Sequence, residues 1–353
     1  MPNPPLGGTL GFVPARGQPE LRQQSDHASE RGSPMTPKPR SYGTLHGGLT
    51  YITIGSGDPL VVIPGLLPNH EALTGRARQS QAEQLKGVAG NRRVWWVNRR
   101  PHLEPGTTME HLARDYAEAL RHKFGKPVDV VGLSTGGSIA LQLAADHPDV
   151  VKRLVVASAA YRLSPLARQA QAEAANYLEA DDPRSAATAI VPLLSTTRVG
   201  QRMLRALAWL GGATLFKNAS ADLVATIRAE DGFNVKDRLA NITAPTLVVG
   251  GANDPLYSDD LFRDTAALIL RGQLDLVEGA GHIRAQAGRS FEVRVLAFLD
   301  ATDEELAADL AVARSATHAA AAKRAALADS SRPADASAYA AAPPADPETG
   351  YQD

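Results

Sequence analysis

The sequence predicts a doubly wound α/β fold built on a mostly parallel β-sheet. Short apolar runs rich in β-branched residues alternate along the chain with longer segments of helical periodicity. Apolar runs without polar alternation are typical of strands that are covered on both faces, as in parallel sheets. A third observation is an interval without strand-like runs, at about 160–235, which predicts a helical insertion within the alternation.

The strand-like and helical segments follow one another in order. The first strand-like segment, 48–55, alternates polar and apolar residues before a glycine-rich turn, which predicts an antiparallel strand near a sheet edge. The continuous apolar runs that follow are 59–65, 93–98, 128–133, 153–158, 245–251 and 274–279. Helical patterns lie at 107–124, 138–148, 259–272 and 290–300.

The helical insertion at about 160–235 is expected to act as a cap. Ligands of doubly wound sheets bind at the carboxyl ends of the strands, and we expect the insertion to cover that edge. The alternative is that its helices only pack on one face of the sheet. Its large apolar residues predict either an apolar substrate pocket or a core within the cap: Leu204, Leu207, Trp209, Leu210 and Phe216.

Both ends of the chain differ in composition from its centre. Residues 1–40 are rich in Pro, Gly, Arg and Ser and predict a disordered segment, so that Met35 is an alternative translation start to Met1. Residues 41–300 form the predicted folded domain. Residues 301–353 are Ala-rich and predict a largely disordered tail, of which the first half has a helical pattern with almost no bulky apolar stripe.

The composition excludes several classes of protein. The 353 residues carry a net charge of −1, so no overall field attracts nucleic acid or an anionic membrane. Cysteine is absent, which excludes disulfides and thiolate catalysis. No apolar run is long enough to span a bilayer and no signal peptide is evident, so we expect a cytoplasmic protein. The sequence contains no phosphate-binding loop or metal-ligand spacing, and we expect no cofactor and no metal.

The segment 132–136, Gly-Leu-Ser-Thr-Gly, is the strongest catalytic pattern in the chain. It matches G-x-S-x-G between a predicted strand and a predicted helix. A serine on such a sharp turn projects its hydroxyl above the sheet, and the N-terminus of the following helix stabilises negative charge beside it. The alternative is a turn of small residues that only allows the helix to pack closely. We predict that Ser134 is a nucleophile.

A serine nucleophile needs a histidine as base and an acid that orients the histidine. His282 is the predicted base, because it lies on a glycine-containing loop just after an apolar strand. Asp254 follows the strand at 245–251 and is the predicted acid. Asp259 and Asp260 are alternatives, but they occupy positions typical of a helix start.

The order Ser134, Asp254, His282 resembles that of the α/β-hydrolase superfamily, and the resemblance extends over about residues 43–300. It is carried by VVGLSTGGSIALQLAADHPDVVKRLVVAS, ITAPTLVVGGANDP and LDLVEGAGH. The resemblance implies an eight-stranded, mostly parallel sheet, a Ser-Asp-His triad, and a helical cap inserted before the last two strands. A serine at this turn argues against the dehalogenase and epoxide-hydrolase chemistry of the superfamily, which uses an aspartate there.

Two backbone N–H groups are expected to bind the oxyanion of the reaction. One belongs to Thr135, the residue after the nucleophile. The other is assigned to Leu66, because Pro64-Gly65-Leu66 stands where relatives commonly have His-Gly-x. His70 follows in the same loop and is expected at the surface, with contact to substrate as the alternative.

A second departure from the relatives follows the strand at 93–98. This chain has Asn98-Arg99-Arg100-Pro101-His102 where many relatives have Asp-x-Arg-Gly. The arginines are expected to brace loops by salt bridges, and the alternative is that these residues bind an acidic group of the substrate. Trp95 and Trp96 are predicted in the core.

The sequence therefore predicts a serine hydrolase that cleaves a small or medium carboxylic ester through an acyl-enzyme. Its expected partner is a small-molecule ester substrate, without nucleic acid and without a membrane span. Carbon–carbon bond hydrolysis, thioester hydrolysis and cofactor-free perhydrolysis use the same triad and are alternatives. A non-catalytic ligand-binding protein of the same fold is the alternative from another class of protein.

Overall fold

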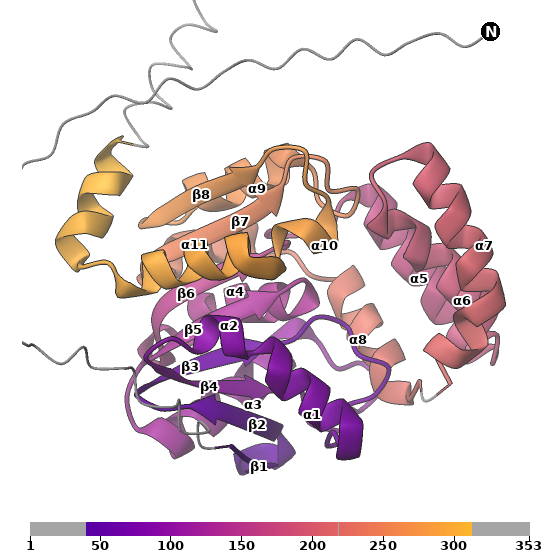
Figure 1. Cartoon of the computed structure of the whole chain (residues 1–353), viewed down its shortest axis with the longest axis horizontal. Helices are drawn as coiled ribbons and strands as arrows, with labels where there is room; N and C mark the ends of the chain where they lie inside the picture. The colour runs from indigo at the N-terminus through magenta and orange to yellow at the C-terminus, as the bar shows by residue number, and fades with distance from the viewer. Residues whose placement is uncertain (1–39, 218, 313–353) are drawn as a thin grey trace, which may run out of the picture. The chain divides into compact units, whose positions relative to one another are not determined.

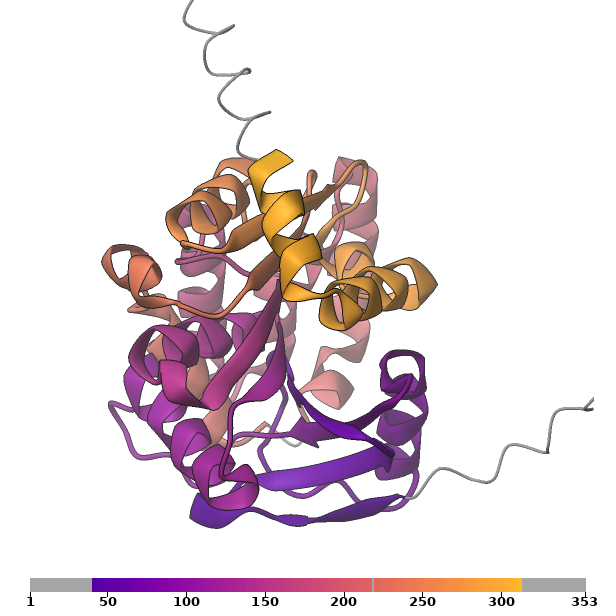
Figure 2. The same ribbon diagram turned by 90° about the vertical axis from the view of Figure 1, so that its left-hand side faces the viewer.

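The computed structural model describes residues 40–312 except residue 218, and its main feature is an eight-stranded sheet (Figures 1 and 2). The strand order is β1-β2-β4-β3-β5-β6-β7-β8. β2 is antiparallel to β1 and β4, and all other neighbours are parallel, which confirms the predicted fold class. The strands are β1 (Ser41–Thr44), β2 (Thr50–Gly55), β3 (Asp58–Ile63), β4 (Arg92–Val97), β5 (Val128–Leu133), β6 (Val151–Ala157), β7 (Thr246–Gly251) and β8 (Gly272–Val277).

The central strands are buried on both faces, which explains their continuous apolar runs. Side chains alternate between the two faces of a sheet, and neighbours such as Val61 and Val62 belong to two different apolar clusters. Trp95 and Trp96 divide in the same way, and both are in the core as predicted. One face is covered by α3 (Met109–Phe124), α4 (Thr135–Asp146) and α9 (Asp259–Leu268). The other is covered by α1 (Gly75–Gln84), α2 (Lys86–Ala89) and α11 (Gly288–Asp300).

Four helices lie between β6 and β7, and we call them the cap: α5 (Pro165–Glu179), α6 (Pro183–Ile190), α7 (Arg198–Leu215) and α8 (Ala221–Asp231). Figure 1 shows α5, α6 and α7 beside one end of the strands, with α8 between them and the sheet. Local sequence determines where three of these helices begin. The side chains of Ser164, Asp182 and Thr197 each accept a hydrogen bond from a backbone N–H in the first turn.

Several short elements complete the described part of the chain. The four-residue edge strand β1 and the helices α1 and α2 have weak patterns and were not predicted. The remaining short helices are η1 (His46–Gly48), η2 (Pro148–Val150), η3 (Val191–Leu194), η4 (Lys236–Asn241) and α10 (His282–Ala285). Residues 303–312 are also helical, and Leu306 is buried against α11 in the second apolar cluster. Predictions for 1–39 and 313–353 lie outside the described residues.

No helix in residues 40–312, residue 218 aside, is both long and apolar enough to cross a bilayer.

A nearly buried ion pair joins the starts of β4 and β5. Arg92 Nη1 donates to Asp129 Oδ2 at 2.6 Å. Arg92 Nη2 donates to the carbonyl of Leu299 and to Asp300, both near the end of α11. Burial raises the pKa of Asp129, and the charge of Arg92 opposes this shift. The pair therefore ties two central strands to a helix that is distant in sequence.

We expect Asp129→Ala to lower the free energy of unfolding by about 3 kcal/mol, because Arg92 would lose its buried carboxylate partner and would keep only the exposed carboxylate of Asp300. Urea denaturation at neutral pH measures the change. Asp149→Ala is the matched control: its pair with Arg121 is exposed, and exposed pairs contribute at most about 1 kcal/mol. Equal losses in the two variants would contradict the prediction.

Candidate active site

Ser134 lies on a turn that joins β5 directly to α4. Its φ of 53° and ψ of −126° are unusual for a residue with a side chain. A Cβ at Gly132 would lie 2.7 Å from the Cβ of Ala140, and a Cβ at Gly136 would lie 2.5 Å from the carbonyl oxygen of Pro64. Both glycines are therefore required for this close approach, which lifts the Ser134 side chain above the sheet.

The three predicted catalytic residues form one chain of hydrogen bonds. Ser134 Oγ lies 2.9 Å from His282 Nε2, and His282 Nδ1 lies 2.8 Å from Asp254 Oδ2. An ionised carboxylate only accepts hydrogen bonds, so Nδ1 carries the proton and Nε2 accepts from the serine hydroxyl. His282 and Asp254 are both buried. The structure therefore brings these residues together in the geometry of a nucleophile, a base and an orienting acid.

Neighbouring groups hold the acid and the base in place. Asp254 follows β7, and its Oδ1 accepts hydrogen bonds from the backbone N–H groups of Leu256 and Tyr257 at 2.9 and 3.4 Å. The Tyr257 ring lies nearly parallel to the His282 ring, with centroids 6.1 Å apart. Ser158, at the end of β6, donates its hydroxyl to the His282 carbonyl at 2.8 Å. No sequence pattern distinguishes Ser158, because its positive φ of 52° is visible only in the structure.

The two predicted oxyanion donors lie on segments that adjoin Ser134. A Cβ at Gly65 would be 3.2 Å from the Ser134 Cβ, so the loop that carries Leu66 runs beside the nucleophile. Thr135 is the first residue of α4, and its N–H therefore has no acceptor within the helix. Their roles as oxyanion donors remain predictions.

Arg99 braces the loop beside the nucleophile. Its guanidinium is fully buried and donates to the carbonyls of Pro64 and Gly65 at 3.0 and 2.8 Å. Burial lowers the pKa of Arg99. Arg100 pairs with Asp115 at 2.8 Å. The bracing expected of these arginines is therefore present, although Arg99 achieves it through carbonyl groups and not through a salt bridge.

The prediction that His70 lies at the surface is wrong. His70 is fully buried, and its Nε2 accepts a hydrogen bond from Arg99 Nε at 2.9 Å. Nδ1 therefore carries the proton and donates to the carbonyl of Arg100 at 3.0 Å. Burial and the charge of Arg99 lower the pKa of His70 from 6.5 to about 3, so the ring is neutral. The prediction failed because the loop around His70 is polar in sequence, and nothing in that loop indicates that Arg99 from the loop after β4 is buried against it.

Glu230 is a buried carboxylate that sequence analysis missed. It lies near the end of α8 and accepts hydrogen bonds from the hydroxyls of Thr135 at 2.7 Å and Ser138 at 2.8 Å. Gln171 and Tyr257 donate to it at 3.3 and 3.4 Å. Burial raises the pKa of Glu230, and the hydrogen bonds from Thr135, Ser138 and Gln171 oppose the shift. Through Glu230 the cap is attached to the first turn of α4, next to the nucleophile.

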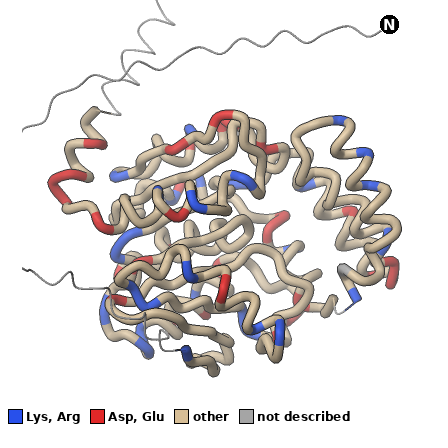
Figure 3. Tube along the Cα trace, viewed as in Figure 1, with Lys and Arg blue, Asp and Glu red and all other residues tan. Residues whose placement is uncertain are grey.

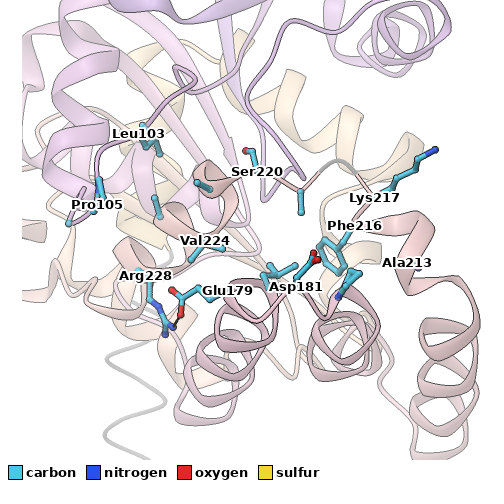
Figure 4. A pocket seen from close by; sticks show the side chains of 16 residues that line it. Leu103, Pro105, Glu179, Asp181, Ala213, Phe216, Lys217, Ser220, Val224 and Arg228 are labelled. Atoms are coloured by element: carbon cyan, nitrogen blue, oxygen red, sulfur yellow. Dashed lines mark hydrogen bonds and ion pairs between the residues drawn. The ribbon is translucent and has the colours of Figure 1, made fainter.

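A pocket of about 790 Å³ lies between the cap and the loop after β4. In Figure 4, Leu103 and Pro105 of that loop lie across from Phe216 and Val224 of the cap. Ser134 and His282 do not line this pocket. Leu66 packs in the same apolar cluster as Phe216 and Val224, so the pocket adjoins the loop beside the nucleophile.

The large apolar residues of the cap have different environments. Phe216 lines the pocket, and Leu204 is half-buried. Leu207, Trp209 and Leu210 are exposed on α7. For these three residues, the prediction of a pocket wall or a cap core is wrong, because more than half of each side chain is exposed. Trp209 has Arg184 of α6 beside it, with the guanidinium carbon 6.0 Å from its ring centroid.

Residues 60–291 match the alpha/beta hydrolase family, and the chain belongs to this family. Over 181 residues it is 26% identical to the "Putative carbamate hydrolase RutD" of Caulobacter vibrioides (strain NA1000 / CB15N). That alignment covers 51% of this chain and 67% of the relative.

Solved structures show the same fold. One is MGS-M2, an alpha/beta hydrolase enzyme from a Medee basin deep-sea metagenome library. It superimposes with a TM-score of 0.61 at 18% identity, and the match covers 74% of this chain and 98% of the MGS-M2 chain. The enol-lactonase from Burkholderia xenovorans LB400 superimposes with a TM-score of 0.58 at 22% identity. That match covers 74% of this chain and 100% of the enol-lactonase chain. Within the described residues, no group of three or more His, Cys, Asp or Glu side chains is arranged to hold a metal ion.

We expect His70 to make the folded protein less stable in acid. Below pH 6.5 the unfolded chain binds a proton on His70 that the folded protein, with a pKa of about 3, does not bind. Between pH 7 and pH 5 this costs about 2 kcal/mol of unfolding free energy. Urea denaturation at both pH values should show a loss of this size that is absent in His70→Gln, whose amide can replace both hydrogen bonds. Parallel pH dependences of the two proteins would contradict the assignment.

Proposed function

We propose that this protein is a serine hydrolase that cleaves small or medium carboxylic esters. The observation that carries the proposal is the continuous hydrogen-bonded chain from Ser134 through His282 to Asp254. A serine hydroxyl becomes nucleophilic at neutral pH when an adjacent base removes its proton, and this geometry supplies that base. Membership of a hydrolase family is consistent with this chemistry.

In the proposed first half-reaction, Ser134 Oγ attacks the ester carbonyl carbon and its proton passes to His282 Nε2. Asp254 stabilises the imidazolium that forms. The carbonyl oxygen becomes an oxyanion, which accepts hydrogen bonds from the N–H groups of Thr135 and Leu66. The bond to the alcohol oxygen then breaks, Nε2 returns the proton to that oxygen, and an acyl-enzyme remains.

In the second half-reaction, water attacks the acyl carbon and gives a proton to His282 Nε2. The second tetrahedral intermediate is stabilised by the same two N–H groups. When it collapses, the bond to Ser134 Oγ breaks and Oγ takes the proton back from Nε2. The products are a carboxylic acid, an alcohol and the unchanged enzyme.

The names of the relatives support a reaction at a carbonyl carbon. RutD is named for carbamate hydrolysis, and the structural neighbour from Burkholderia xenovorans is named an enol-lactonase. Both names describe the hydrolysis of a carbonyl group bonded to a heteroatom. An ester-type substrate is consistent with these two names.

We expect Ser134→Ala to abolish covalent labelling by a fluorophosphonate probe and to lower kcat on p-nitrophenyl acyl esters by about 10⁴–10⁶-fold, because the attacking oxygen is removed. Asp254→Asn should lower kcat by about 10³–10⁴-fold, since the imidazole would lose its orienting acid. Labelling is measured by in-gel fluorescence and kcat by release of p-nitrophenol.

The matched control is Ser290→Ala, which removes an exposed serine on α11. This variant should be labelled and should turn over esters like the unmodified protein. If Ser134→Ala were labelled to the same extent, or if the unmodified protein neither reacted with the probe nor cleaved any ester of the series, the proposed function would be wrong.

We further propose that the pocket between the cap and the loop after β4 receives the acyl chain. The shared apolar cluster of Leu66, Phe216 and Val224 supports this placement, because it joins the predicted oxyanion loop to the pocket wall. Each buried methylene contributes about 0.8 kcal/mol, or up to about fourfold in kcat/KM.

We expect kcat/KM to rise with acyl length from acetate until the pocket is filled. Val224→Trp, which fills part of the pocket, should reduce the ratio of kcat/KM for hexanoate to that for acetate. Ala172→Trp is the control, because Ala172 lines a separate pocket of about 460 Å³. An unchanged ratio in Val224→Trp would place the acyl chain elsewhere.

A further inference from the structure

Helix α7 of the cap exposes an unusually apolar surface. Val199, Met203, Leu207 and Leu210 are 68%, 62%, 59% and 75% exposed. Their spacing of four, four and three residues places them on one side of the helix. We call these four residues the α7 apolar face. On another side α7 packs against α6, where a Cβ at Gly212 would lie 2.8 Å from the Cβ of Ala187.

A row of arginines borders the α7 apolar face. Arg198, Arg202 and Arg205 follow one another at spacings of four and three residues, which places them along a second side of α7. All three are exposed and take part in no ion pair within the described chain, and Arg205 also lines a groove of about 240 Å³ against α5 and α6. Trp209 continues this row and is 54% exposed, and the guanidinium carbon of Arg184 from α6 lies 6.0 Å from its ring centroid. The sequence contains no Asp or Glu from 183 to 221. Figure 3 shows Lys and Arg positions along α7 without an acidic position on that helix.

We propose that the α7 apolar face docks on the surface of a lipid bilayer that contains anionic phospholipids. An exposed helix with apolar side chains on one side and arginines with a tryptophan at the border has the pattern of helices that lie in a membrane interface. The apolar side chains would enter the acyl boundary, while Arg198, Arg202 and Arg205 would contact phosphate groups. The net charge of −1 gives no overall attraction, so the attraction is local to the cap.

The arginine row favours a bilayer over a second copy of this chain. Two copies that met face to face through α7 would be related by a twofold axis, so that each row of arginines would face the other copy. Neither copy would supply an acidic residue from α6 or α7 to balance these charges. Like charges brought together in this way oppose association. In an anionic bilayer, the phosphate groups would neutralise the arginines and the acyl region would bury the exposed apolar side chains.

The start of α7 adjoins the candidate active site. A Cβ at Gly281, the residue before His282, would lie 2.5 Å from Cγ2 of Thr196, two residues before α7. Docking would therefore hold the loop of the base near the bilayer. If the proposed ester hydrolysis is correct, this position suits an amphiphilic ester that is dissolved in the membrane. The docking itself does not depend on that activity.

The test is co-sedimentation of the full chain with vesicles of phosphatidylcholine alone and with vesicles in which part of this lipid is replaced by phosphatidylglycerol. We expect binding to the anionic vesicles that weakens as salt is added. The combined change Arg198→Gln, Arg202→Gln and Arg205→Gln should weaken it on the order of 100-fold, about fivefold for each arginine. Leu207→Ser with Leu210→Ser should weaken it by at least about tenfold.

The controls change exposed residues of the same types on α11. Arg289→Gln and Val293→Ser should bind like the unmodified protein. Ser134→Ala should also bind normally, which separates failure of this proposal from failure of the hydrolase proposal. The proposal is overturned by an absence of binding to anionic vesicles, or by equal binding of the triple arginine variant. A dimer in light scattering that Leu207→Ser dissociates would overturn it too, and would assign the face to a second copy.

Discussion

The close approach of the backbone at Ser134 is the constraint on which the site depends. The chain passes from β5 into α4 without an intervening loop, and Gly132 and Gly136 are required because side chains there would collide with the helix and with the neighbouring loop. That loop, with Gly65, consequently lies directly against the turn. One contact thus positions the Ser134 hydroxyl, the first turn of α4 and the loop that carries Leu66.

Two fully buried charged side chains hold the two sides of this turn. Arg99 donates to the carbonyls of the Gly65 loop, and Glu230 accepts from the hydroxyl of Thr135. Each charge is hydrogen-bonded mainly to neutral groups: Arg99 donates to carbonyl oxygens, and Glu230 accepts from hydroxyl and amide groups. Buried charges are tolerated only while such partners remain in place. Movement of either segment would leave a charge unsatisfied, and this penalty keeps both segments fixed.

The sequence predicted the sheet and the hydrogen-bonded chain of serine, histidine and aspartate because both follow from local patterns. Each of those three residues comes after an apolar strand, and parallel strands bring their carboxyl ends to one edge. Glu230 was missed for two reasons. The segment around it has the pattern of an ordinary exposed helix end, and its partner Thr135 is 95 residues away in the sequence. His70 was misplaced because its partner Arg99 comes from another loop. Helical periodicity identified the apolar residues of α7, but not which side is covered.

The link between Glu230 and Thr135 determines which part of the cap can be exchanged. A cap replaced as a whole, from α5 to α8, would remove the anion that the first turn of α4 is built to bind, and would leave hydroxyl groups buried without an acceptor. The segment from α6 to α7 contributes no hydrogen bond to Glu230. In the evolution or engineering of this chain, α6 and α7 are therefore the replaceable unit, whereas α8 belongs functionally to the core.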